Sequence, residues 1–524
     1  MNNLDSEKIN WPILWVIILG TFMAILDGSI VNVALPKMMA IFNVSTDKIQ
    51  WVSTAYMLAL GITIPISGFL GDNFGYKKTY IFALAVFVLG STLCGMAWSP
   101  ESIVGARIIQ AVGGGIMQPL GMAMIYKSFP RSKIGMVLGI WGIASMAAPA
   151  VGPTLGGYLV EYSNWRLIFF INLPIGILNL YMAANILKET ALVKVKHFDY
   201  WGVILSTVGL FCLLLALSEG NNEGWTSPYI VSLFAVAVIC LTAMITNELQ
   251  HPEPILDLRL FKNLTFTLTT IIGSLIAIGM FGAIFLVPIL LQSVLGQTAM
   301  KTGIIMFPAA LASGFMMPIS GRLFDKYGAK GVAIVGLGIV AWTTYMMKDF
   351  NALTPFVVMT MWLVVRGLGM GLCMMPVTTA GMNTVSPELI GRASALGNVI
   401  RQVASSFGIA MFTSVMANRQ VFHLANLAGS VNTDSNAYLS IQATLRNMAV
   451  TNGLSTGAVQ GLGLSTVYAQ IVKSSMVSAI TDCFILATAM CCLALVLILF
   501  LKEKRQPHLV KKEMPEPGHL VMET

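Results

Sequence analysis

Fourteen apolar stretches, each long enough to cross a lipid bilayer as an α-helix, constrain the fold of this sequence more than any other feature. They cover residues 11–35, 49–70, 78–97, 101–124, 135–159, 166–187, 200–219, 228–247, 264–292, 303–321, 330–348, 354–376, 391–418 and 475–501. Charged residues make up only 10% of the chain, against roughly 25% of a soluble domain, which excludes a water-soluble enzyme. The sequence therefore predicts an all-α polytopic membrane protein with 14 transmembrane helices.

The placement of lysine and arginine predicts the orientation of these helices. If both termini lie inside the cell, the inner loops and the tail carry most of the 31 Lys and Arg residues, as the positive-inside rule requires. This bias accounts for the net charge of +8 without a nucleic-acid partner. The seven cysteines lie within apolar stretches and the five histidines lie in loops or the tail, so we expect no metal site.

An internal repeat divides the chain. Residues 68–75 match residues 321–328, and Ile134-Gly135 matches Ile390-Gly391. The copies keep the same direction, which predicts two six-helix bundles related by an axis along the membrane normal, with substrate bound between them near mid-membrane. The predicted domains are a first bundle at 1–190, an inserted helix pair at 191–262, a second bundle at 263–501 with a long outer loop at 419–473, and a cytoplasmic tail at 502–524.

Six motifs occur in order along the chain, at residues 26–36, 68–78, 107–113, 152–157, 197–202 and 256–261. Together they resemble the 14-helix drug:proton antiporters of the major facilitator superfamily (MFS), of the EmrB/QacA type. The resemblance implies the MFS fold, alternating access, and a bacterial inner (cytoplasmic) membrane with both termini in the cytoplasm. It also implies transport driven by the proton gradient without a cofactor and, in a double-membrane bacterium, a periplasmic adaptor as partner.

Asp27 is the most informative residue, because a carboxylate inside an apolar span is costly and usually marks a proton or cation pathway. Loss of water favours the protonated form of a carboxyl group, which a proton carrier requires. Arg107 is expected at a similar depth on its own helix, and in the family the matching arginine is linked to proton coupling. We assign Asp27, Arg107 and, as a second acid, Asp482 to proton coupling. The alternative for Asp27 and Arg107 is a purely structural hydrogen bond or ion pair, and the alternative for Asp482 is a position at an outer water pocket.

Polar residues inside the spans are also candidates for a substrate cavity. Two arginines of the second bundle fall near the middle of their predicted helices, where they could pair with anionic or polar substrate groups or with backbone carbonyls. The predicted cavity comprises Asp27, Asn32, Gln110, Arg366 and Arg401.

The loop after the second span has the charges and turn residues of a gate. Asp72 can meet the positive start of the next helix, and glycines permit a tight turn. The family has basic residues where Asn73 and Tyr76 stand here, and a loop that only sets topology is the alternative. The predicted gate comprises Gly68, Asp72, Gly75, Lys77, Lys78 and, in the second copy, Asp325.

The fifth span contains four residues that predict a bend and close helix packing, Gly152, Pro153, Gly156 and Gly157. The residues themselves indicate only a bend. The resemblance implies that this pattern marks export rather than uptake.

These features predict a proton-coupled exporter of many lipophilic, mainly cationic compounds, with the lipid bilayer as its surroundings. A cavity with a carboxylate and aromatic walls favours lipophilic cations. The alternative is a dedicated exporter of one lipid, peptide or metabolite; a membrane-embedded enzyme or a receptor is a third reading. No Walker loop is present, which argues against direct use of ATP, and no catalytic constellation lies at a shared depth, so we predict no enzyme.

Overall fold

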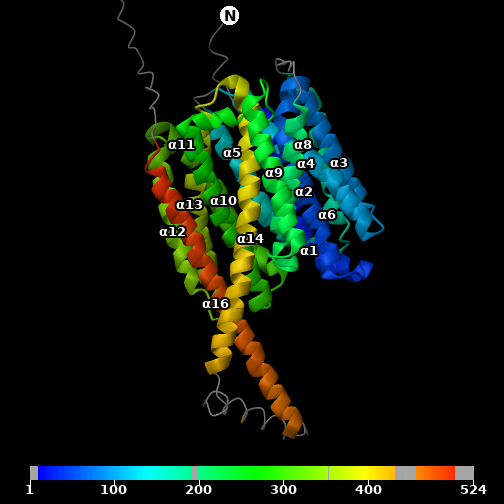
Figure 1. Cartoon of the computed structure of the whole chain (residues 1–524), viewed down its shortest axis with the longest axis vertical. Helices are drawn as coiled ribbons and strands as arrows, with labels where there is room; N and C mark the ends of the chain where they lie inside the picture. The colour runs from blue at the N-terminus through cyan, green and yellow to red at the C-terminus, as the bar shows by residue number, and fades with distance from the viewer. Residues whose placement is uncertain are drawn as a thin grey trace, which may run out of the picture.

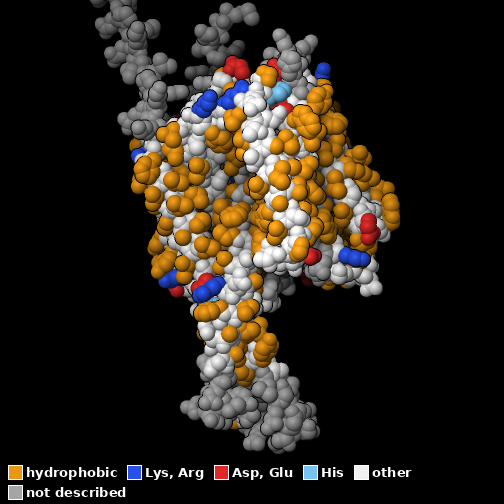
Figure 2. Space-filling view, in the orientation of Figure 1, with side chains coloured by type: hydrophobic (Ala, Val, Ile, Leu, Met, Phe, Trp, Pro, Cys, Tyr) orange, Lys and Arg blue, Asp and Glu red, His pale blue; other side chains and the backbone are white. Residues whose placement is uncertain are grey.

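The computed structural model describes residues 10–130, 133–189, 199–351, 353–430 and 456–501, together with Ala443. Among these residues, 14 helices are long and apolar enough to cross a membrane, and no strand occurs. The predicted all-α class and number of spans are therefore confirmed. Figure 2 shows an apolar belt with charged side chains mainly at its two rims, as a protein that sits in a bilayer requires.

The first half of the chain contributes nine α-helices, of which α6 and α7 together form one span; most of them are labelled in Figure 1. Their bounds are α1 (Trp11–Phe42), α2 (Thr46–Phe74), α3 (Tyr76–Gly95), α4 (Pro100–Ser128), α5 (Ile134–Tyr162), α6 (Leu167–Phe170), α7 (Asn172–Ile186), α8 (Tyr200–Glu223) and α9 (Pro228–Gln250). The second half contributes α10 (Leu264–Ile289), α11 (Ala299–Tyr327), α12 (Ala329–Met346), α13 (Phe356–Met382), α14 (Ile390–Ser430) and α16 (Thr456–Ile498). We call the end at which α1 begins and α16 finishes the inner end, and the opposite end the outer end.

Local sequence explains where these helices begin and turn. Ser99 and Ser102 form a capping box at the start of α4, and Asn263 accepts two backbone N–H groups at the start of α10. The matching ends of α2 and α11 stop at Gly75 and Gly328, whose φ angles are 93° and 84°. Only glycine adopts this conformation at low cost, so the repeat seen in the sequence is a repeat of the turn as well.

Contacts between the two halves follow the same repeat. α5 packs along α11, and α2 packs along α14. α8 and α9 pack mainly on each other, and α8 also contacts both α2 and α14. The inserted pair therefore lies beside the junction of the two bundles.

The predicted outer loop at 419–473 is wrong over much of its length. α14 continues to Ser430 and α16 already begins at Thr456, so residues 419–430 and 456–473 are helical; we call them the outer hairpin. At 41 and 43 residues, the two helices are about 60 Å long, twice the hydrocarbon thickness of about 30 Å. Figure 1 shows them projecting well beyond the other helices.

Candidate functional site

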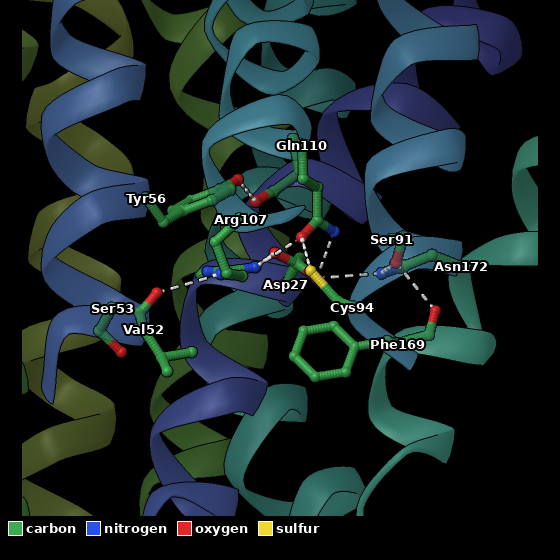
Figure 3. A network of polar contacts seen from close by, with 12 residues as sticks. Asp27, Val52, Ser53, Tyr56, Ser91, Cys94, Arg107, Gln110, Phe169 and Asn172 are labelled. Atoms are coloured by element: carbon green, nitrogen blue, oxygen red, sulfur yellow. Dashed lines mark hydrogen bonds and ion pairs between the residues drawn. The ribbon is translucent and has the colours of Figure 1, made fainter. Parts of the chain in front are cut away.

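A buried polar network lies among α1, α4 and α7 (Figure 3). Asp27 of α1 is fully buried, and Arg107 of α4 is 1% exposed; the Arg107 Nη1 donates to Asp27 Oδ2. The other carboxylate oxygen, Asp27 Oδ1, accepts hydrogen bonds from Gln110 Nε2 at 2.8 Å and from Asn172 Nδ2 at 3.1 Å. Three donors therefore hold the carboxylate, and the sequence-predicted residues Asp27, Arg107 and Gln110 are brought together.

Arg107 has further contacts that do not involve Asp27. Its Nη1 also donates to Gln110 Oε1 at 2.8 Å, and its Nε donates to the carbonyl of Val52 at 3.3 Å. The guanidinium carbon lies 3.8 Å from the ring centroid of Tyr56, a cation–π contact. The arginine is thus fixed by α2 as well as by α1.

Asn172 and Tyr56 were not predicted from the sequence. Asn172 also donates to Ser91 Oγ at 3.0 Å, and Ser91 donates to the carbonyl of Phe169 at 2.9 Å, so α3 supports the amide from behind. A fully buried asparagine inside an apolar span is a usable signal, since it needs a polar partner there. The register of α7 against α1, which sequence alone does not give, decides that the partner is Asp27.

The other predicted cavity residues lie apart from this network. Asn32 is on α1 nearer the outer end, and its Oδ1 accepts a hydrogen bond from Ser53 Oγ at 2.9 Å. Arg366, in the second bundle, donates to Thr344 Oγ1 at 3.2 Å and to the carbonyl of Gly279 at 3.0 Å. Arg401 lines a separate small pocket between α10, α13 and α14.

Asp482 lies at the base of the outer hairpin and not near Asp27. Its Oδ2 is 2.5 Å from Arg419 Nε and 2.8 Å from His423 Nε2, both on α14, and its side chain is 24% exposed. This cluster ties α16 to α14 where both helices leave the body of the protein. A partly exposed ion pair of this kind contributes little stability.

Asp72 is at the centre of the predicted gate. It accepts hydrogen bonds from the Tyr76 hydroxyl at 2.8 Å and from Lys127 Nζ at 3.3 Å, and Arg392 Nε of α14 lies 4.0 Å away. Lys77 binds the loop end of α7, because its Nζ donates to the carbonyl of Ala184 at 2.7 Å. Lys78 is exposed.

The two glycines of the repeat bring the bundles into backbone contact at the inner end. A Cβ on Gly68 would lie 2.9 Å from the carbonyl oxygen of Gly391, and a Cβ on Gly321 would lie 2.6 Å from that of Gly135. Asp325 also faces Gly135, since a Cβ there would lie 3.1 Å from Asp325 Oδ1. The inner end therefore has two equivalent contacts, α2 to α14 and α11 to α5.

These contacts yield a prediction. Replacing Gly68 or Gly321 by leucine places a side chain where a backbone carbonyl now lies, so we expect the inner ends of the paired helices to separate by several Å. Spin-label distances between α2 and α14, and between α5 and α11, measure this separation. Gly105→Leu is the control, because a Cβ on Gly105 meets no atom. Unchanged distances in both Gly68→Leu and Gly321→Leu would show that these glycines are not needed for the close approach of the paired helices.

The glycines of the fifth span act in packing. A Cβ on Gly156 would lie 2.8 Å from Ile30 Cγ1 of α1, and one on Gly157 would lie 3.3 Å from Met300 Cβ of α11. A Cβ on Gly152 would meet the side chain of Ser29 of α1. Pro153 lies inside the continuous helix α5. α5 can therefore approach α1, which carries Asp27, and α11 of the other bundle at the same level.

Among the described residues, no group of three or more His, Cys, Asp or Glu side chains is placed to hold a metal ion. Fourteen spans, repeated contacts between two halves and a buried acid–base network define a polytopic helical membrane transporter. Residues 17–409 match the family model of the Major Facilitator Superfamily. The chain belongs to this superfamily, and its resemblance to the drug:proton antiporters is supported by the relatives described next.

Three bacterial proteins illustrate these relatives. The chain is 38% identical over 512 residues to the uncharacterized MFS-type transporter YhcA of Bacillus subtilis, covering 98% of this chain and 96% of YhcA. It is 35% identical over 404 residues to the multidrug transporter protein MdtP of the same organism, covering 77% and 74%. It is 29% identical over 519 residues to the tetracenomycin C resistance and export protein of Streptomyces glaucescens, covering 97% and 94%.

A solved structure supports the fold. The proton:xylose symporter XylE superposes with a TM-score of 0.57 at 14% identity, over 94% of this chain and 96% of XylE. At this identity the likeness concerns the fold alone.

Proposed function

We propose that this protein is a proton-coupled multidrug exporter that moves lipophilic compounds, cations among them, out of the cell by alternating access. One observation carries the proposal: Asp27 is a fully buried carboxylate whose charge is balanced by Arg107 beside the packed α1–α5 contact. A buried acid of this kind is a natural proton site. The multidrug part is supported by the name of MdtP.

The network can exchange a proton without losing its arginine. When Asp27 takes up a proton, its ion pair with Arg107 is weakened, while the Val52 carbonyl, the Gln110 side chain and the Tyr56 ring still hold the guanidinium. Asn172 Oδ1 is buried and has no hydrogen-bond partner among the described residues. Rotation of this amide would let Oδ1 accept the hydrogen bond of a protonated Asp27.

The proposed cycle uses these two states. Protonation of Asp27 from the outer side accompanies release of the substrate, and loss of the proton at the inner side restores the ion pair and the affinity for the next substrate. In this proposal, the close approach of α2 to α14 at Gly68 and of α11 to α5 at Gly321 supports an inner end that is closed in this conformation. The proton gradient supplies the energy, and the proposed cycle requires no cofactor.

The proposed setting is a bacterial inner (cytoplasmic) membrane, with both termini in the cytoplasm. The distribution of Lys and Arg supports this orientation. In a double-membrane bacterium, a periplasmic adaptor is a proposed partner.

Export of a single compound is the second candidate, and the name of the tetracenomycin C exporter favours it. That relative aligns with 97% of this chain, so the same architecture is compatible with a narrow substrate. The two proposals share the proton step and differ only in the breadth of the substrates.

Substrate-induced proton movement in proteoliposomes tests both proposals. A pH-sensitive dye reports proton release when lipophilic cations, neutral drugs, lipids and metabolites are added in turn to the purified protein. We expect release with several structurally unrelated drugs. A response to one lipid or metabolite alone would favour the dedicated exporter, and no response to any compound would contradict proton-coupled export.

A further inference from the structure

A small polar pocket lies near the inner end of the second bundle, away from Asp27. It is enclosed by α10, α13 and α14 and by Met122 of α4, and its volume is about 50 Å³. About 10–15 Å³ holds one water molecule on this scale, so the pocket has room for a small charged group. Its polar lining consists of Thr269, Thr270, Ser274, Thr378, Ser394 and Arg401.

Arg401 is the one cation in this lining. Unlike Arg107 and Arg366, its guanidinium makes neither an ion pair nor a hydrogen bond among the described residues. A partly buried charge without a partner is costly. An anion in the pocket would remove this cost, and the hydroxyl groups around it can donate hydrogen bonds to the same anion.

A second, apolar pocket adjoins the first. It lies between α8, α9, α10 and α14, which run alongside one another (Figure 1), and its volume is about 890 Å³. Pockets for drug-sized molecules span roughly 300–1,000 Å³. Its lining includes Leu213, Phe234, Leu241, Phe261, Ile400 and Phe407.

The two pockets meet at α10 and α14. Ser274 lines both of them, and the neighbouring Gly273 and Gly397 line the polar pocket. A Cβ on either glycine would meet no atom, so neither helix fills the space between them at this level. The apolar pocket therefore ends beside an unpaired cation.

We propose that these joined pockets bind a lipophilic organic anion, with its carboxylate or phosphate group on Arg401 and its apolar body between α8, α9, α10 and α14. Arginine suits this role because its planar fork donates two parallel hydrogen bonds to such groups. The inference deepens the proposed export function by naming a further substrate class. It rests on that function only for the step from binding to transport.

Binding to the purified full-length protein in nanodiscs of zwitterionic lipid tests the site directly. The probe is fluorescent pyrenebutyrate, and its neutral amide and pyrenebutylamine are the matched uncharged and cationic probes. We expect Arg401→Gln to weaken pyrenebutyrate about 10- to 100-fold and to leave the other two probes unchanged. Arg401→Lys keeps the charge and recovers part of the affinity, and Lys348→Gln, which removes a partly exposed cation outside both pockets, has no effect.

Gly397→Leu provides a second, independent variant, because its side chain grows into the open space where the pockets meet. It should weaken pyrenebutyrate while Gly331→Leu, whose Cβ also meets no atom but which lies on α12, does not. Equal binding of the acid and the amide to the wild type, or unchanged pyrenebutyrate binding in Arg401→Gln, would overturn the proposal.

Two further experiments distinguish a membrane lipid from a free anion as the ligand, and binding from transport. Phosphatidylglycerol in the nanodiscs competes with the probe if the anion is a membrane lipid; absence of competition assigns the site to a free carboxylate. In proteoliposomes, loss of anion transport in Arg401→Gln with cation transport intact supports the site. Anion binding without any wild-type transport would contradict the export proposal and leave the binding site established.

Discussion

Asp27→Asn is expected to reduce proton-coupled export to the level of protein-free liposomes. Asparagine matches the shape of aspartate, and its amide oxygen can still accept a hydrogen bond from Arg107, but it cannot take up or release a proton at physiological pH. Drug-induced proton release and drug movement are measured in the same proteoliposomes. We expect both to be lost. In the proposed cycle Asp27 is protonated on the way to the inner side and ionised on the way back with substrate, and asparagine cannot alternate between these two states.

Two controls make this result specific. Asp482→Asn removes a second ion-paired aspartate, at the outer hairpin, and is expected to transport at the wild-type level. Retained binding of a lipophilic probe by Asp27→Asn shows that the variant is folded. Normal proton release by Asp27→Asn would remove Asp27 from the cycle, and loss of release in Asp482→Asn alone would move the proton step to the outer end.

Among the single variants proposed here, Arg107→Gln is expected to cause the largest loss of folding stability. It leaves Asp27 ionised in a fully buried position with only the two amide donors of Gln110 and Asn172, and breaking a buried ion pair costs about 3–5 kcal/mol. Thermal unfolding of the protein in detergent, followed by intrinsic fluorescence, measures the change. The double variant Asp27→Asn with Arg107→Gln strands no charge and should recover much of the loss, a coupling that a double-mutant cycle quantifies.

The pH dependence gives an independent check of the same variant. A neutral, protonated Asp27 needs no positive partner, so Arg107→Gln should gain stability relative to the wild type as the pH is lowered. Arg366→Gln is the control, since among the described residues Arg366 hydrogen-bonds to Thr344 and a backbone carbonyl, so its removal strands no carboxylate there. If the stability difference between Arg107→Gln and the wild type did not change with pH, an unpaired charge on Asp27 would not be the cause of the stability loss.

Sequence reasoning succeeds here where the bilayer dictates the pattern. A helix that crosses the hydrocarbon core needs about 20 predominantly apolar residues, so all 14 were predicted, and the repeated turns at Gly75 and Gly328 were visible as repeated motifs. Asp27 and Arg107 could be paired because each is a rare charge at a similar depth of its own span. Their contact required only that two helices be neighbours.

The remaining features depend on information that hydropathy does not carry. The outer hairpin lies beyond the apolar spans, so its residues look like a loop, although α14 and α16 continue through it as helices. Asn172 and Tyr56 joined the network only through the register between helices. Arg366 and Arg401 looked alike in the sequence. Only the three-dimensional structure distinguishes them, because Arg366 binds Thr344 and a backbone carbonyl while Arg401 lines a pocket.

The balance of charge at Asp27 and Arg107 has an electrical consequence. With Asp27 ionised the pair is neutral, and with Asp27 protonated the same site carries one positive charge on Arg107. In the proposed cycle the site therefore crosses from the outer to the inner side as a cation and returns as a neutral pair. When the exported compound is neutral, a membrane potential that is negative inside contributes up to about 2.3 kcal/mol per 100 mV to this exchange, so voltage drives export even when the two sides have the same pH. A monovalent cation that leaves in exchange for one proton cancels the transferred charge, so its export responds to the pH difference alone.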